Sequence, residues 1–317
     1  MTQRHRARAK TKRPAFTAAP LKPARRPVFV VTGRDKIAIR RGATIGHRVI
    51  AKAMPLSQPA GGYRPGHDYG VFVAGKSFEV RELSAAMPPG LRGLIGGFHF
   101  APGGNATART GGDNVPAINP RSVWDTNFRP ACTDPRGMTL VDGPRGKFWC
   151  DIYLLAKDHL TRGTSRFAAT IADGNDPPQN PDGGYFAKLD YATAVAVMKH
   201  HGKGLLSIEE FFAAAFGVTE RTSHSGDPVA TQLDAARTSK FGLMQATGNL
   251  WVWGHDGDPD QPRPSIFGGS WWIDDVAGSR QAGVDYWAVN SSENLGARGR
   301  SDHLPPESSP RQRRRAR

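Results

Sequence analysis

The sequence predicts an α+β protein in which a small β module precedes a larger mixed domain. Three observations support this fold class. The 317 residues include 37 glycines and 25 prolines, a composition that favours turns over a helical bundle. Residues 28–50 and 69–82 alternate apolar and polar positions, as half-buried strands do. Two later segments, 191–201 and 207–216, repeat their apolar residues at helical spacing.

Short strands joined by turns account for the first part of the chain. The alternating segments 28–50 and 69–82 together predict a small β module over residues 28–86. The next stretch, 87–118, is rich in Gly, Pro, Asn and Thr. Such a composition predicts a Gly/Pro-rich connection dominated by loops.

Strands are also predicted after residue 119. The apolar runs 148–155 and 167–172 are typical of strands, and the second ends in an Asp-Gly turn signal. Residues 240–254 resemble a buried strand with its approach, in which alternate tryptophans share one face.

Two helices are predicted between these strands. The helix over 191–201 has Asp190 as its N-cap and a glycine at its end. The second helix begins with a capping box formed by Ser207 and Glu210. Its apolar residues form one core-facing stripe, namely Ile208, Phe211, Phe212, Ala215 and Phe216.

The net charge of +15 is concentrated at the two ends of the chain. Residues 1–50 contain fourteen Lys or Arg and one acid, and residues 305–317 contain five Arg and one Glu. The segments 1–27 and 305–317 have few apolar residues and are predicted to be disordered tails. Arginine runs attract phosphate polymers, so unspecific contact with nucleic acid or an acidic partner stays open beside a merely solvating role.

Other composition features exclude several classes of protein. No run of eighteen apolar residues is present, so the sequence predicts no membrane insertion, and the apolar stretch 28–31 is too short for a signal peptide core. These features by themselves leave the localisation unknown. Cys132 and Cys150 are expected to be free thiols, with a disulfide between them left open.

The motif search predicts neither a catalytic site nor a metal or cofactor site. The loop 254–262 has aspartates at the spacing of a calcium loop, but Gln261 and Phe267 replace the Gly and Glu that an EF-hand requires. His200 and His201 are adjacent on a helix and point in different directions. Nucleophile elbows, phosphate loops and zinc motifs are absent from the sequence.

Residues 268–304 have neither strand nor helix periodicity. A set of Gly, Trp, Arg and Asp residues suggests a rigid frame, with side chains of varied chemistry between them. We expect the arginines of this frame to pair with aspartates, because buried charges need partners. The frame comprises Gly268, Gly269, Trp271, Arg280, Arg298, Arg300 and Asp302.

Several of these motifs resemble known families. The segments LSIEEFFAAAFG, GNLWVWG and GGSW resemble stretches of the formylglycine-generating enzyme (sulfatase-modifying factor) family, which has a C-type-lectin-like fold. The motifs GGSW, AGSR and LGARGRSDHL resemble more specifically the variable region of diversity-generating retroelement target proteins, the group that includes phage tropism determinants. The resemblance covers about residues 119–304 and implies a C-type-lectin-like domain there, with its variable region at 268–304.

In that group a reverse transcriptase rewrites adenines, so that chosen codons vary while the frame persists. The resemblance implies outward-facing variable positions that bind a ligand. Trp272 departs from this pattern, because changing only the adenines of an AAC or AAT codon cannot produce tryptophan. The positions carried over are Ser270, Trp272, Ile273, Asp274, Val276, Gly283, Asp285, Tyr286, Asn290, Ser292, Asn294 and Leu295, with Asp275 and Val289 left open as further variable positions.

The sequence therefore predicts a non-catalytic display protein whose C-terminal surface recognises a protein or glycan on a target cell. Trp272 and Tyr286 are the expected anchors, because aromatic side chains give a large contact area at low entropic cost. A homo-oligomer, such as a trimer, is expected because one site of this size binds weakly. The alternatives are a sulfatase-modifying type of enzyme, which this chain's lack of cysteine after Cys150 disfavours, and a nucleic-acid-binding protein acting through its basic tails.

Overall fold

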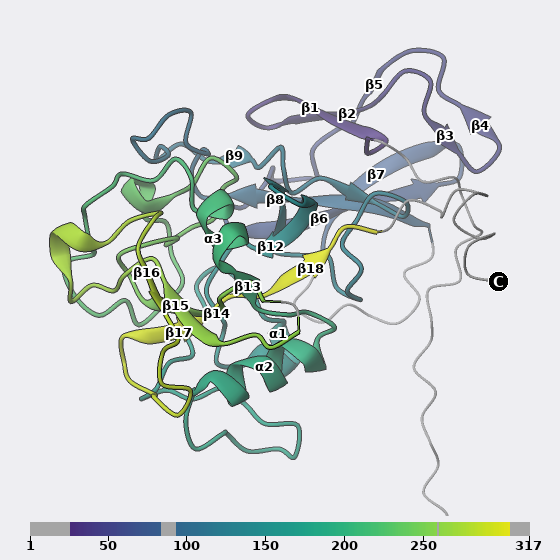
Figure 1. Ribbon diagram of the computed structural model, residues 1–317. Helices are drawn as coiled ribbons and strands as arrows, with labels where there is room; N and C mark the ends of the chain where they lie inside the picture. The colour runs from purple at the N-terminus through teal and green to yellow at the C-terminus, as the bar shows by residue number, and fades with distance from the viewer. Residues whose placement is uncertain (1–25, 84–92, 259, 305–317) are drawn as a thin grey trace, which may run out of the picture.

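The computed structural model describes residues 26–83, 93–258 and 260–304. The predicted tails 1–27 and 305–317 lie outside the described residues, apart from Arg26 and Pro27. Strands outnumber helices, and the strands nearest the N-terminus gather at one end of the molecule (Figure 1). The described helices include none long and apolar enough to cross a membrane.

The N-terminal part is a β module, as the alternating sequence predicts. Its small sheet has the order β1-β2-β5, from β1 (Phe29–Gly33), β2 (Lys36–Ile39) and β5 (Met54–Pro55). A hairpin of β3 (Thr44–Ile45) and β4 (Arg48–Val49) follows β2. Strands β6 (His67–Ala74) and β7 (Ser77–Glu82) belong to a second sheet. Phe29, Tyr69 and Phe98 are among the residues that fill the core shared by the two sheets.

The expected loop-dominated connection over 87–118 needs correction at residues 94–101 and 117–118, which are strands, whereas residues 102–116 are irregular. Strand β8 (Leu94–Ala101) pairs with β6, and also with β9 (Ala117–Ile118) and β10 (Trp124–Asp125). The glycines that suggested a loop allow close packing instead. A Cβ atom on Gly97 would lie 2.9 Å from the Trp124 ring. Residues 84–92 lie outside the described chain.

The C-terminal part is built on two sheets. One has the order β11-β12-β18, from β11 (Met138–Gly143), β12 (Gly146–Asp151) and β18 (Arg300–Asp302). The other has the order β13-β14-β15-β16, with β17 also paired to β14. Its strands are β13 (Leu206–Ser207), β14 (Trp251–His255), β15 (Pro264–Phe267), β16 (Ala282–Val284) and β17 (Leu295–Ala297).

Short helices connect and cover these strands. They are α1 (His159–Arg162), α2 (Tyr191–His200), α3 (Ile208–Ala214) and the 3₁₀ turns η1 (Ala235–Arg237) and η2 (Asp274–Val276). The predicted caps are confirmed: Asp190 accepts from the Thr193 amide, and Ser207 with Glu210 forms the capping box. The Phe211 ring of α3 stacks on that of Phe267 at 5.1 Å between centroids, so α3 packs directly beneath the start of the 268–304 segment.

Three strand predictions need correction in their extent. Strand β12 ends at Asp151, so the predicted run to residue 155 is too long. Residues 167–172 take part only in isolated bridges, and the strand predicted over 240–254 is confined to β14. The apolar residues of these stretches are buried in irregular loops, which a short apolar run does not distinguish from strands. Both cysteines are buried free thiols, and burial raises the pKa of Cys150 to about 12.

Candidate functional site

The 268–304 segment leaves β15, forms a series of loops at the end of the molecule away from β1–β5, and returns through β17 and β18 (Figure 1). Fixed parts of the chain hold these loops by backbone hydrogen bonds. The Tyr191 amide donates to the Ala288 carbonyl over 3.1 Å, and the Gly174 amide to the Ser292 carbonyl over 3.0 Å. The loops therefore project from a buried base, which consists of β12, β14, β17 and the irregular stretch 244–250.

Arg298 is the centre of this base. Its side chain is fully buried, and its two terminal nitrogens donate to backbone carbonyls over 2.6–3.2 Å. These carbonyls belong to Asp151, Ile152, Met244 and Gln245, so one guanidinium joins β12, the 244–245 loop and the strand β17. Burial lowers the pKa of Arg298 below its ordinary value.

The expected pairing of arginine with aspartate is correct only in part. Arg300 donates to Asp302 over 2.6 Å, but its more buried partner is Glu210 of α3, also at 2.6 Å. Arg298 uses carbonyls instead of a carboxylate. Arg280 is exposed and lies over the Phe212 ring at 5.3 Å, where its charge interacts with the aromatic face. Planar guanidinium groups satisfy either kind of partner, which the sequence could not distinguish.

Gly268, Gly269 and Trp271 of the predicted frame lie against the base, whereas Asp302 is exposed. Gly268 and Gly269 are buried with positive φ angles of 89° and 79°. A Cβ atom on Gly268 would lie 2.9 Å from the Phe211 ring, so glycine is required there. Trp271 is partly buried against the apolar cluster that includes Leu250.

Most of the carried-over variable positions face solvent at least in part. Trp272 is 70% exposed and Val276 is 55% exposed, and the carboxylates of Asp274 and Asp285 are also exposed. The side chains or backbones at six others are half-buried, namely Ile273, Gly283, Tyr286, Asn290, Ser292 and Asn294.

Two of the twelve positions are buried, contrary to the expectation of outward-facing side chains. Ser270 has no exposed surface because its backbone bridges to Asn249 in the base. Leu295 is 1% exposed because it begins β17 and pairs with Trp251 of β14. Neither side chain reaches a ligand on the surface.

Internal hydrogen bonds order several of the half-buried side chains. The Tyr286 hydroxyl accepts from the side-chain nitrogen of Asn290 over 2.8 Å. The Tyr286 ring packs against Trp253, with 5.9 Å between the ring centroids. Ser292 donates to the Asn294 side-chain oxygen over 2.7 Å. This ordering reduces the entropy that these side chains would lose on binding a ligand.

Sequence reasoning missed the most exposed large apolar side chain of the described chain. Trp287 is 80% exposed, and its neighbour Val284, which was also missed, is 47% exposed. Val289, which the sequence left open as a variable position, is 72% exposed. These three side chains lie in an apolar run, VDYWAV, which by itself resembles a buried strand. The signal that could have found them is their position between two frame motifs, AGSR and LGARG.

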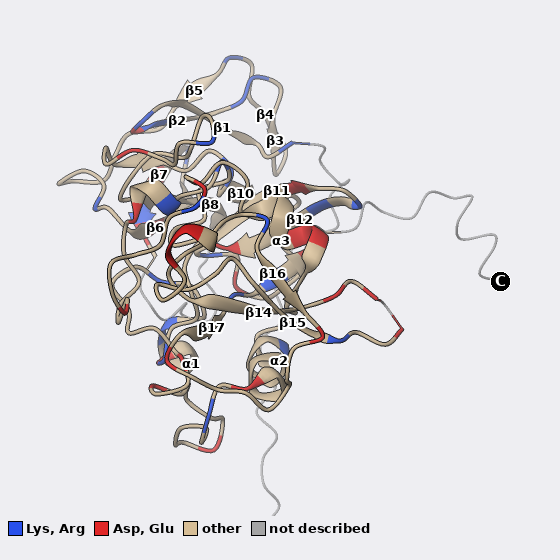
Figure 2. Ribbon diagram, turned by 60° about the vertical axis from the view of Figure 1, so that its left-hand side comes forward, with Lys and Arg blue, Asp and Glu red and all other residues tan. Residues whose placement is uncertain are grey.

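The 254–262 loop does not use its aspartates as a calcium site requires. Asp256 accepts from the backbone amides of Asp258 and Arg263, and Asp258 accepts from the Asp260 amide. The carboxylates thereby form turns within the loop, whose acidic and basic residues are marked in Figure 2. Among the described residues, no group of three or more His, Cys, Asp or Glu could hold a metal ion.

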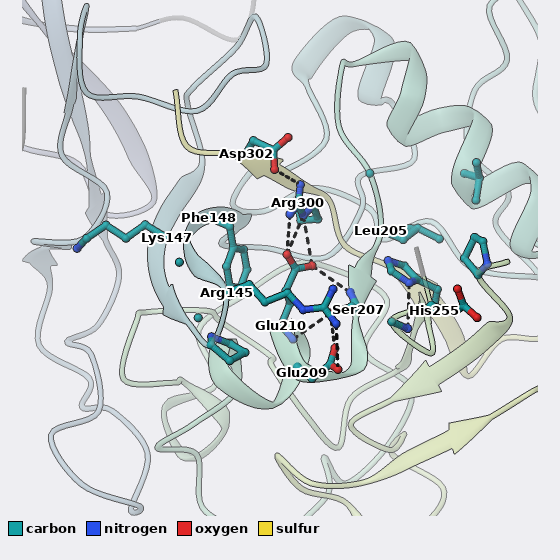
Figure 3. A pocket seen from close by; sticks show the side chains of 18 of the residues that line it. Arg145, Lys147, Phe148, Leu205, Ser207, Glu209, Glu210, His255, Arg300 and Asp302 are labelled. Atoms are coloured by element: carbon teal, nitrogen blue, oxygen red, sulfur yellow. Dashed lines mark hydrogen bonds and ion pairs between the residues drawn. The ribbon is translucent and has the colours of Figure 1, made fainter. Parts of the chain in front are cut away.

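A separate pocket of about 620 Å³ lies between the β11–β12 turn, α2 and the start of α3 (Figure 3). Its most buried carboxylate, Glu210, accepts from Arg300 and from the Ser207 amide. Burial lowers the pKa of His255 on the opposite wall, and its Nδ1 accepts from the Gly257 amide. The polar groups of this pocket thus support the capping box and β18.

Comparisons with known proteins identify the family. Residues 27–125 match the family model described as the Mtd second domain. The chain is 40% identical over 320 residues to the tail fiber receptor-binding protein of Bordetella phage BPP-1, covering 87% of this chain and 82% of the relative. The chain belongs to the major tropism determinant family.

Solved structures of this family have the same fold. The I1 variant of the major tropism determinant matches with a TM-score of 0.78 and 36% identity, over 88% of this chain and 84% of that chain. The U1 variant matches with the same TM-score and coverage at 35% identity. The C-type-lectin-like fold expected from the sequence is confirmed. The family model of the second domain matches up to residue 125, where β10 ends, so this match spans the strands from β1 to β10.

Proposed function

We propose that this chain is a non-catalytic receptor-binding display protein, whose loops between residues 271 and 294 recognise a macromolecule on a target cell surface. The Bordetella phage relative is named as a receptor-binding protein, and the tropism determinants are not enzymes. The observation that carries the proposal is the exposure of Trp272 and Trp287 above a base fixed by Arg298. Tryptophan is enriched at protein interfaces and among the residues that contribute most to binding.

The contact set differs somewhat from the one carried over by resemblance. We place Trp287, Val284 and Val289 in it, because their side chains are exposed among the variable positions. We leave out Ser270 and Leu295, which are buried. The contact set then consists of Trp272, Ile273, Asp274, Val276, Gly283, Val284, Asp285, Tyr286, Trp287, Val289, Asn290, Ser292 and Asn294.

Diversification by a retroelement is part of this proposal. Substitution is tolerated where a side chain does not contribute to the core, and the exposed positions of the contact set meet this condition. The neighbouring DNA tests it directly. We expect a near-copy of the codons for 268–304, differing only where the copy has adenine, close to a reverse transcriptase gene.

A single shallow surface binds its ligand weakly, and several linked copies that bind at once raise the overall affinity. We therefore propose a homo-oligomer, with a trimer as the expected state, which light scattering of the purified full chain measures. Contact of the basic tails 1–27 and 305–317 with nucleic acid is a separate proposal. Salt-dependent retention on DNA that disappears when both tails are deleted would support it.

Adsorption to bacterial cells tests the receptor-binding function. Purified, fluorescently labelled full chain is mixed with a panel of bacterial strains, and we expect it to adsorb to some strains and not to others. The variants W272A and W287A should lose most of this adsorption. The control V49S changes an apolar residue that is 64% exposed on the β module and should adsorb normally. Equal adsorption by all variants would refute the proposed surface.

A further inference from the structure

A fixed segment outside the variable region holds the loop that carries Trp272, Asp274 and Val276. This supporting segment comprises residues 219–224, which follow α3 in the chain. The loop leaves the base at Trp271 and returns to it at Ala277. Both ends of the loop contact the supporting segment, so one short piece of fixed sequence sets the position of the exposed residues between them.

The contact at the outgoing end involves Ser223. Its hydroxyl lies 3.2 Å from the Trp271 carbonyl and 3.3 Å from the Asp274 carboxylate. The contact at the returning end begins with a backbone bond, in which the Arg221 amide donates to the Ala277 carbonyl over 2.9 Å. Arg221 has a positive φ of 59°, an uncommon conformation for a residue with a side chain.

Glu220 makes the strongest contacts at the returning end. One carboxylate oxygen accepts from the Ser279 hydroxyl over 2.5 Å, and the other accepts from the Ser279 amide over 2.9 Å. Arg109 donates to the same carboxylate over 3.2 Å. Ser279 is fully buried, and hydrogen bonds to a charged acceptor are about twice as strong as neutral ones.

Glu220 also accounts for two residues of the AGSR motif, Gly278 and Ser279. Ser279 supplies two donors to one carboxylate, which no apolar residue could do. A Cβ atom on Gly278 would collide with a carboxylate oxygen of Glu220, so a larger residue there would push this carboxylate away from its present position. The motif is therefore shaped by a residue some sixty positions earlier in the chain.

We propose that Glu220 is a positioning residue of the ligand surface: its carboxylate fixes Gly278 and Ser279, and thereby the loop 271–277. The consequence for ligand binding rests on the proposed function, but the positioning itself does not. It can therefore be measured without any ligand, as the local opening of the loop.

Hydrogen exchange followed by mass spectrometry measures this opening in the full chain. In E220A the peptide covering 270–281 should exchange at least about tenfold faster, because tenfold corresponds to about 1.4 kcal/mol and a hydrogen bond to a charged group contributes at least that much. E220Q should give a smaller increase, because its amide oxygen still accepts one Ser279 donor. The double variant E220A/S279A should exchange no faster than E220A, because both changes break the same contact.

The control and the second readout distinguish positioning from general stabilisation. E209Q changes a glutamate in the first turn of α3 and should leave the exchange of 270–281 unchanged. Peptides of β11 and β12 should exchange at the wild-type rate in E220Q and S279A. The proposal is overturned if the 270–281 peptide is unaffected in E220A and E220Q, or if β11 and β12 exchange faster by the same factor. Failure of receptor binding would appear separately, as unchanged adsorption of W272A and W287A.

Discussion

Two short stretches of the 268–304 segment behave in opposite ways. Residues 295–299 are all buried, and they include the guanidinium that gathers four backbone carbonyls. Residues 284–289 are exposed except for Tyr286, and they include the most exposed tryptophan of the described chain. Only residues 290–294 separate the two stretches, and the exposed one, VDYWAV, is the more apolar of the two. The difference shows that position relative to the base, and not residue type, separates the fixed role from the adaptable one.

Of the changes considered for this segment, replacement of Arg298 should lower the free energy of unfolding the most. The variant R298M keeps an apolar stem but leaves several buried carbonyls without donors, at a cost of about 1–3 kcal/mol for each one that stays unsatisfied. We expect the free energy of unfolding to fall by at least about 3 kcal/mol in chemical denaturation. The stability of R298K should lie between those of the wild type and R298M, because lysine can donate to fewer carbonyls than arginine. A variant as stable as the wild type would show that the base does not depend on this residue.

Substitution of Gly268 should have the next largest effect. In G268A the new Cβ would contact the Phe211 ring in a left-handed backbone conformation, so we expect a loss of about 1–3 kcal/mol. G226A is the matched control, because a Cβ there meets no atom within 4 Å. Thermal unfolding of the two variants checks the difference. Equal melting temperatures would contradict the account of the frame glycines.

The helix beneath the base should contribute less. S207A removes the capping box of α3, whose Phe211 supports Gly268, and should cost about 1 kcal/mol. The change should appear in chemical denaturation with an unaltered slope. A cost below a few tenths of a kcal/mol would mean that packing alone fixes the start of α3.

Single changes on the exposed face should have the smallest effect on stability. W272A and W287A should each change the free energy of unfolding by no more than about 0.5 kcal/mol. W253A removes a fully buried tryptophan of β14 and should cost about 3–5 kcal/mol. A large loss in W287A would show that its ring packs against the fold instead of facing a ligand.

The features predicted correctly from sequence are those decided locally. The caps at Asp190 and Ser207 need only residues within three positions, and α2 and α3 begin where these caps predict. The frame motifs, which are short and contiguous in the sequence, also indicated the family that the comparisons show.

The features missed depend on distant parts of the chain. Gly97 resembles a loop residue in sequence, but it lies against Trp124 inside a sheet. Ser270 and Leu295 were assigned to the surface by spacing, although Asn249 and Trp251 bury them. No local pattern reveals such pairings, and the role of Glu220 is hidden for the same reason.

Replacement of the exposed face as a whole tests the central claim most directly. One variant would carry alanine or serine at Trp272, Asp274, Val276, Asp285 and Trp287 together, and its thermal unfolding would be compared with that of R298M. We predict that the five-fold variant melts within a few degrees of the wild type, since each kcal/mol of stability lost lowers the melting temperature by about 2–4 °C. The melting temperature of R298M should be much lower. A collapse of the five-fold variant to the level of R298M would contradict the claim that these side chains are free to change.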